Sequence, residues 1–130
     1  MVTLKNGDIL RFLCSFQHKG AAWSGAKLYA AIGQKDTFFN EVQGMNGTTI
    51  ITGIKDDPDW VTYQNTVDVP ISNIGGTGGA VPGSMYEAYV KLISIPGADI
   101  FWYGPLNDIT LEAPIGVAEF RNLAVSYQKA

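Results

Sequence analysis

Short runs in which apolar and polar residues alternate dominate the sequence, and turn-forming residues separate these runs. In the clearest run, from Ile9 to Gln17, every second residue is apolar: Leu10, Phe12, Cys14 and Phe16. Because successive side chains of a β-strand point to opposite faces, the run predicts a strand with one face in a core. The run from Ala26 to Gly33 predicts a second strand of the same kind.

The next two runs, Phe38 to Gln43 and Thr48 to Ile54, flank the tetrapeptide Gly44-Met45-Asn46-Gly47. Asn-Gly accepts the positive φ angles of a tight turn, so this arrangement predicts a β-hairpin. The acidic sequence from Asp56 to Asp59 contains Pro58 and predicts a turn through which no strand continues.

A further alternating run, from Trp60 to Ile71, predicts the next strand. The glycine-rich stretch from Ser72 to Ser84 then predicts a long surface loop, since glycine gives conformational freedom at an entropic cost. The segment from Ser84 to Ile93 fits a capped helix as well as a strand. Its shortness and the flanking Pro-Gly pairs favour the strand.

Three more strands are predicted in the last third of the chain. Ile100 to Tyr103 and Ile109 to Ala113 are expected to pair with each other, and Val117 to Gln128 forms the last strand. Its apolar positions change phase, which indicates a β-bulge near Asn122. They are Ala118 and Phe120 before the bulge, and Leu123, Val125 and Tyr127 after it.

About eight or nine short strands without a long helix predict an all-β fold, a two-sheet antiparallel β-sandwich. We expect an immunoglobulin-like topology, with a jelly roll as the alternative. The chain has 130 residues, the length of one domain, and no linker or repeat divides it. Residues 1–130 are therefore predicted to form a single sandwich domain.

Composition narrows the possible partners. Only 16% of residues are charged, the net charge is −3, and the basic residues are scattered singly, which argues against nucleic-acid binding. No apolar run approaches the roughly 20 residues of a membrane span, and the N-terminus lacks a signal-peptide pattern. We therefore expect no membrane insertion. The location stays open between a chain made in the cytosol and a domain excised from a longer surface protein.

Several landmarks follow one another in a recognisable order: Gly7-Asp8, Ala26-Lys27-Leu28-Tyr29, Trp60-Val61-Thr62-Tyr63, Pro82-Gly83-Ser84-Met85-Tyr86 and Tyr89-Val90-Lys91-Leu92. In this order, roughly residues 7–113 resemble bacterial cell-adhesion-related immunoglobulin-like modules. The resemblance implies a non-catalytic module for adhesion or spacing, and it assigns no functional residues. The stretch from Ala118 to Leu123 departs from the family and is closer to the closing strand of carbohydrate-binding jelly rolls.

Residues for catalysis are scarce, and we predict that the chain is not an enzyme and has no cofactor. His18 is the only histidine, so any Ser–His or Cys–His arrangement must use it. Its place beside Lys19 at a strand end predicts a solvated residue instead. Cys14 lies on the apolar face of its strand, where cysteine behaves as a small hydrophobic residue.

An acidic cluster supplies the candidate metal site. Asp56, Asp57 and Asp59 offer the carboxylate oxygens that Ca²⁺ binds, although their spacing differs from that of an EF-hand loop. Pro58 interrupts the cluster, and acidic clusters of this kind are typical of solvated turns. We expect no other metal.

The candidate ligand-binding residues are aromatic and lie near predicted loops or strand ends: Trp23, Trp60, Trp102 and Tyr103. Exposed aromatic faces bind sugar rings and partner proteins. The competing interpretation is that each tryptophan closes one end of the core, since tryptophan is highly buried on average.

The expected function is a non-enzymatic binding or structural module of a surface or virion-type assembly, acting through loops or an exposed sheet edge. Its partner would be another protein or a second copy, because an unprotected edge and a low charge favour self-association. The alternative is a carbohydrate-binding domain, with a glycan stacked on Trp60, Trp102 and Tyr103. A small hydrolase using His18 or two carboxylates is the third hypothesis.

Overall fold

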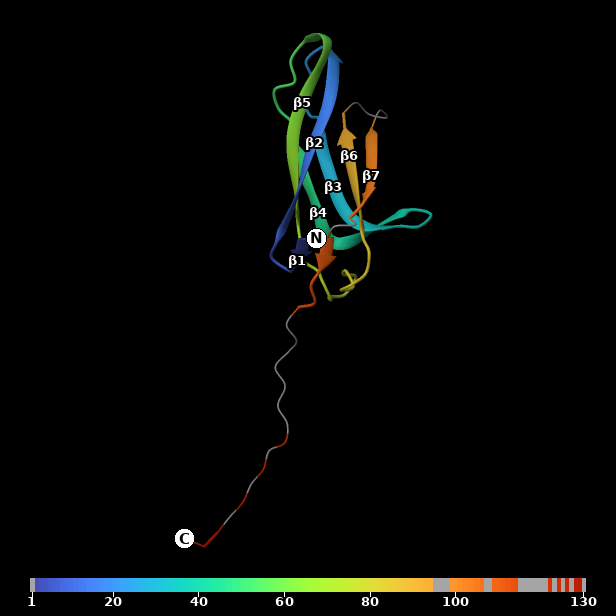
Figure 1. The fold of residues 1–130 in the computed structure, drawn as a ribbon. Helices are drawn as coiled ribbons and strands as arrows, with labels where there is room; N and C mark the ends of the chain where they lie inside the picture. Colours follow the sequence, from blue (N-terminus) through green and yellow to red (C-terminus); the bar gives the residue numbers. More distant parts are fainter. Residues whose placement is uncertain are drawn as a thin grey trace.

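The computed structural model describes residues 2–94, 99–106 and 109–114, and residues 122, 124, 126, 128 and 129. These residues form eight strands, shown in Figure 1: β1 (Val2–Leu4), β2 (Ile9–Gly20), β3 (Lys27–Lys35), β4 (Phe39–Ile50), β5 (Asp57–Pro70), β6 (Glu87–Ile93), β7 (Ile100–Pro105) and β8 (Ile109–Leu111). The described part contains no helix, so no helix in it is long and apolar enough to cross a membrane. The predicted all-β fold is confirmed.

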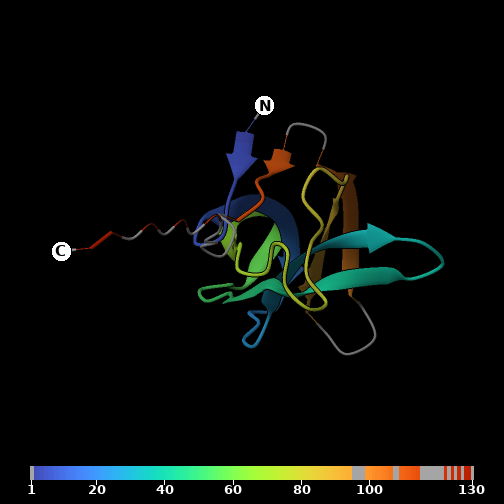
Figure 2. The same cartoon turned by 90° about the horizontal axis from the view of Figure 1, so that it is seen from below.

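Two antiparallel sheets pack together, as expected of a β-sandwich. One sheet has the strand order β4-β3-β6-β7, and the other consists of β2 and β5. A third pair, β1 and β8, is parallel, and its two arrows lie side by side in Figure 2.

The core lies between the two sheets and follows the alternation of the sequence. The predicted strand Ile9 to Gln17 is confirmed as part of β2. The predicted strand Ala26 to Gly33 is confirmed as β3, which begins one residue later than expected, at Lys27. The side chains that meet in the core include Phe12 and Phe16 of β2, Leu28 and Ile32 of β3, Val67 and Val69 of β5, and Val90 and Leu92 of β6. The run Trp60 to Ile71 is a strand that begins three residues earlier than expected.

The predicted hairpin at Gly44-Met45-Asn46-Gly47 is wrong, because β4 continues without a turn from Phe39 to Ile50. Met45 is completely buried, and the register of β3 and β4 shifts between Ala31 and Gly33, as at a bulge. At Gly47 the absence of a side chain lets β4 approach the backbone carbonyl of Asp68 in β5. The glycine thus serves a close contact between strands instead of a turn.

The predicted turn from Asp56 to Asp59 is also wrong, since β5 begins at Asp57. Asp57 pairs with Gly20 of β2 after a register shift that follows the pair His18 and Val61. Pro58 therefore lies where the ladder is irregular, and a residue without an N–H group is tolerated at a bulge or at the start of a strand.

The predicted pairing of Ile100–Tyr103 with Ile109–Ala113 is wrong as well. Strand β7 pairs with β6, and β8 pairs in parallel with β1. Leu4 of β1 and Leu111 of β8 are both buried, which explains the long-range pairing: together they cover one end of the core.

Two other predictions are confirmed. The segment from Ser84 to Ile93 contains a strand, β6 (Glu87–Ile93), and no helix. The glycine-rich stretch from Ser72 to Ser84 is a loop in which the only pairing described is a single bridge between Ile74 and Ala80. The predicted last strand, Val117 to Gln128, lies largely outside the described residues.

Candidate functional site

An apolar groove of about 270 Å³ opens between β2 of one sheet and the edge strand β7 of the other. Six of the residues that line it are Phe12, Cys14 and Phe16 of β2, Leu92 of β6, and Ile100 and Trp102 of β7. Most of its lining is hydrophobic, as is typical of sites that bind a ligand or a protein segment.

The groove exists because the sandwich is closed on one side and open on the other. On the closed side β4 approaches β5, and the hydroxyl of Thr49 donates a hydrogen bond of 2.7 Å to the Thr66 carbonyl. On the open side, among the residues that the structure describes, β2 pairs with β5 alone and β7 with β6 alone. Both strands therefore present an edge without a strand partner at the groove.

Trp102 and Tyr103, two of the predicted site residues, lie on opposite faces of β7. Trp102 lines the groove, is 51% exposed, and has its indole against Gly104, two residues further along the strand. Tyr103 is 44% exposed and pairs with Tyr89 on the outer face of the sheet. Because neighbouring strand residues point to opposite faces, these two rings do not form one binding platform.

Tyr103 belongs to an aromatic cluster on the outer face of the four-stranded sheet, together with Tyr29, Phe39, Tyr89 and Phe101. The Tyr89 ring centroid lies 5.1 Å from that of Tyr103 and 5.2 Å from that of Phe39. The Lys35 ammonium lies 4.4 Å above the Tyr103 ring. This cluster was missed in the sequence analysis. Its signal is a set of aromatic residues at the outward positions of the strands, which are every second residue.

Negative charge at this cluster comes from Glu41, whose carboxylate accepts a 2.6 Å hydrogen bond from the Tyr29 hydroxyl. Burial, followed by this hydrogen bond, raises the pKa of Tyr29 well above its ordinary value. Tyr29 therefore stays protonated and acts as a donor at neutral pH.

The other two predicted aromatics lie elsewhere. Trp60 is 65% exposed near the start of β5, and Trp23 is 38% exposed in the loop after β2. The backbone N–H of Trp23 donates a hydrogen bond of 3.3 Å to the Ile54 carbonyl. The four predicted residues are thus all partly exposed, but the structure does not bring them together on one surface.

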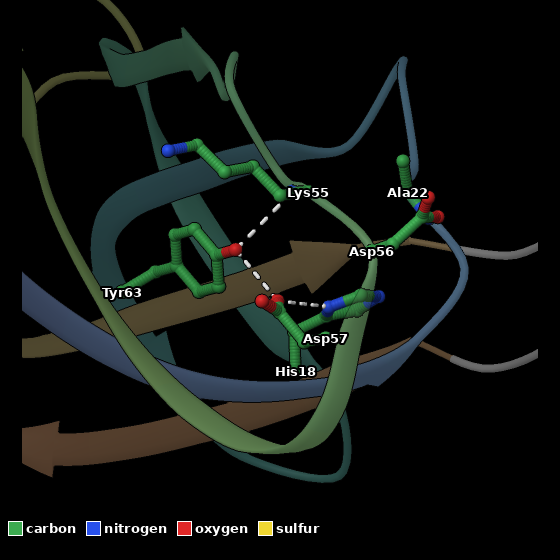
Figure 3. A network of polar contacts seen from close by, with 6 residues as sticks. All are labelled: His18, Ala22, Lys55, Asp56, Asp57 and Tyr63. Carbon is green, nitrogen blue, oxygen red and sulfur yellow. Dashed lines mark hydrogen bonds and ion pairs between the residues drawn. The ribbon is translucent and has the colours of Figure 1, made fainter.

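His18 takes part in a polar network, shown in Figure 3, instead of being the solvated residue that its sequence position predicts. Its Nδ1 lies 2.8 Å from Oδ2 of Asp57, and the Tyr63 hydroxyl donates a 2.6 Å hydrogen bond to the same oxygen. The Lys55 N–H in turn donates to the Tyr63 oxygen at 3.2 Å. The network joins the end of β2 to the start of β5.

The electrostatics of this network centre on Asp57, the one buried polar residue among those described. The hydrogen bond from Tyr63, followed by that from His18, lowers the pKa of the Asp57 carboxyl. The same contact with Asp57 raises the pKa of Tyr63. An ionised Asp57 therefore holds β2 and β5 together. Catalysis of acyl transfer would require a nucleophile and an oxyanion-binding site in addition to this network.

Asp57 makes the stability of the fold pH-dependent. Its pKa is lower in the folded chain than in the unfolded chain, so its stabilisation is present above the unfolded pKa and is lost as the pH falls through the folded pKa. Between about pH 5 and pH 3, the free energy of unfolding is expected to fall more for the wild type than for Asp57→Asn. Urea denaturation at several pH values measures how the free energy of unfolding of each protein changes with pH. Equal changes in the two proteins would contradict the assignment of this pH dependence to Asp57.

The candidate calcium ligands are engaged separately. Asp56 accepts a hydrogen bond of 2.7 Å from the Ala22 N–H, and Asp57 binds His18 and Tyr63. Within the described ranges, no group of three or more His, Cys, Asp or Glu side chains is arranged to hold a metal ion.

Cys14 is half-buried in the groove, and burial raises the pKa of its thiol.

No protein-family model matches this chain, and no curated protein matches it significantly. Three features of the described residues are candidates for a functional surface: the apolar groove between β2 and β7, the aromatic cluster on the outer face, and the network around Asp57.

Proposed function

We propose that the chain is a non-enzymatic binding or structural module of a surface or virion-type assembly, and that it acts through the open edge between β2 and β7. The observation that carries this proposal is the apolar groove, with Trp102 half exposed beside it. Exposed apolar surface of this kind marks interaction sites, and an unpartnered strand edge is a template for another chain.

The partner that suits this edge is a protein segment in extended conformation. Backbone groups of an added strand hydrogen-bond to the edge, and its alternate side chains enter the pocket beside it. Trp102 is an anchor residue of the type that dominates protein interfaces. The low charge of the chain, 16% of residues, favours contact with another apolar surface, including that of a second copy.

We also propose an immunoglobulin-like topology for the sandwich. A jelly roll has eight strands in a double sheet, whereas an immunoglobulin-like sandwich has sheets of unequal width. The arrangement of two strands facing four supports the immunoglobulin-like topology and the resemblance to adhesion-related modules.

Carbohydrate binding is the second candidate, and the observation that favours it is the outer-face cluster. Tyr103 and Phe101 are 44% and 53% exposed there, beside the polar groups of Glu41 and Lys35. Aromatic rings next to charged and polar side chains are suited to stack on a sugar ring. This surface replaces the platform of Trp60, Trp102 and Tyr103 that the sequence suggested.

Trp102→Glu is expected to abolish or weaken self-association at least tenfold, the effect of about 1.4 kcal/mol. The reason is that Trp102 lines the groove, where a carboxylate would have to be desolvated in the complex. Size-exclusion chromatography with light scattering over a concentration series measures the change. Trp60→Glu is the matched control, because Trp60 is even more exposed and lies outside the lining of the groove.

Two outcomes would overturn the proposal. One is a wild-type chain that stays monomeric at every concentration and binds a glycan on an array. The other is an equal loss of association in both tryptophan variants, which would place the contact surface outside the groove.

A further inference from the structure

We propose that the groove binds residues 117–128 of a second copy of this chain as an added strand beside β2, an inference that rests on the proposed function. The groove needs an extended occupant with apolar residues at every second position, because it runs along the edge of β2. The sequence from Val117 to Gln128 has this pattern in its second half.

The spacing of the two patterns agrees. On β2 the groove is lined by Phe12, Cys14 and Phe16, which are successive inward residues. In the proposed occupant the apolar residues with the same spacing are Leu123, Val125 and Tyr127. Each set spans four residue steps, about 13 Å in a strand. An added strand would therefore place Val125 beside Cys14 whether it runs parallel or antiparallel to β2.

The direction of the chain points to a second copy and not to the same molecule. After β8 the Glu112 N–H donates a 2.7 Å hydrogen bond to the Leu4 carbonyl, and Pro114 lies against Gly75 in the glycine-rich loop. In Figure 1 the arrow of β8 points toward this end of the molecule, while β7, whose first residue lines the groove, begins at the opposite end. To enter its own groove, the segment would have to reverse after Pro114 and return along the molecule.

Such a contact is heterologous, since the groove of one copy binds the segment of the next. Heterologous contacts build rings or open fibres instead of closed two-fold dimers. An added strand also covers the edge of β2 that has no partner strand among the described residues. Proteins otherwise protect such an edge against uncontrolled association.

Cys14 makes the inference testable, because it is the only cysteine and lines the groove. Wild-type chain is mixed with a size-tagged chain that carries Cys14→Ser and Val125→Cys, and the mixture is oxidised. A disulfide between Cys14 and the introduced thiol gives a species with one chain of each size on a non-reducing gel. We expect this mixed species, confirmed by mass spectrometry of the linked peptides.

The matched control replaces Val125→Cys by Ser126→Cys in the tagged chain. Because adjacent strand residues point to opposite faces, its mixed species is expected to be at least about tenfold less abundant. Disulfides between two tagged chains have a different mass and are not counted.

Four results would overturn the inference. Equal yields from the two positions would show that the segment does not bind in register as a strand. An intrachain disulfide in a chain with Val125→Cys alone would show that the segment fills its own groove. Absence of the mixed species, while Trp102→Glu still weakens association, would mean that the groove binds another segment; the proposed function would then stand. Absence of both effects would overturn the two proposals together.

Discussion

Gly47→Ala is expected to lower the free energy of unfolding by about 3 kcal/mol, measured by urea denaturation. A Cβ atom at Gly47 would overlap the backbone carbonyl of Asp68. That carbonyl cannot move freely, because Asp68 is paired with Arg11 in the ladder of β2 and β5. The added methyl group would therefore force β4 away from β5 on the closed side of the sandwich.

Thr48→Ala is the control for this prediction, since Thr48 is the next residue of β4 and is exposed. Its loss of strand propensity is expected to cost less than about 1 kcal/mol. If Gly47→Ala were as mild as this control, β4 would not approach β5 in the way described.

Alternation in the sequence was a sound guide wherever a strand has one face in the core. It located β2 and β3, because the inward residues of these strands, such as Phe12 and Ile32, are apolar and the outward ones are mostly polar. It also decided correctly for a strand at Ser84 to Ile93, where the inward residues Val90 and Leu92 are buried.

The errors arose where a local rule for glycine or proline met a long-range contact. The Asn-Gly pair ending at Gly47 satisfies the rule for a turn, but the lack of a side chain is required by Asp68, 21 positions away along the chain. Pro58 satisfies the rule for a strand breaker, but it lies where the ladder is already irregular. A single sequence contains no signal for which strand will approach which glycine.

The candidate site shows the same division. The sequence identified Trp102 as a candidate ligand-binding residue, and it is half exposed. It did not indicate the groove, because the groove results from the unequal width of the two sheets. It also did not indicate the contact of His18 with Asp57, which joins residues 39 positions apart through the irregular end of β2 and β5.

Met45→Ala distinguishes the continuous strand from the hairpin that the sequence suggested. In a hairpin Met45 would lie in an exposed turn, and its truncation would change stability little. In the continuous β4 its side chain is completely buried in the core, among the largest side chains that are fully buried. Its replacement by alanine is therefore expected to lower the free energy of unfolding by about 2–5 kcal/mol, from lost burial and the cavity left behind.

The matched control is Asn46→Ala, because Asn46 is adjacent, is exposed and pairs with Ala31 across the ladder. Its effect is expected to stay within about 0.5 kcal/mol, the usual range for surface positions. Both variants are compared with the wild type by urea denaturation. A shifted midpoint reports a change in stability when the slope of the free energy against urea concentration stays the same. If neither variant changed the free energy of unfolding appreciably, Met45 would lie in an exposed turn and β4 would consist of two separate strands. The close approach of β4 to β5, which closes one side of the sandwich and leaves the groove on the other, would then not exist.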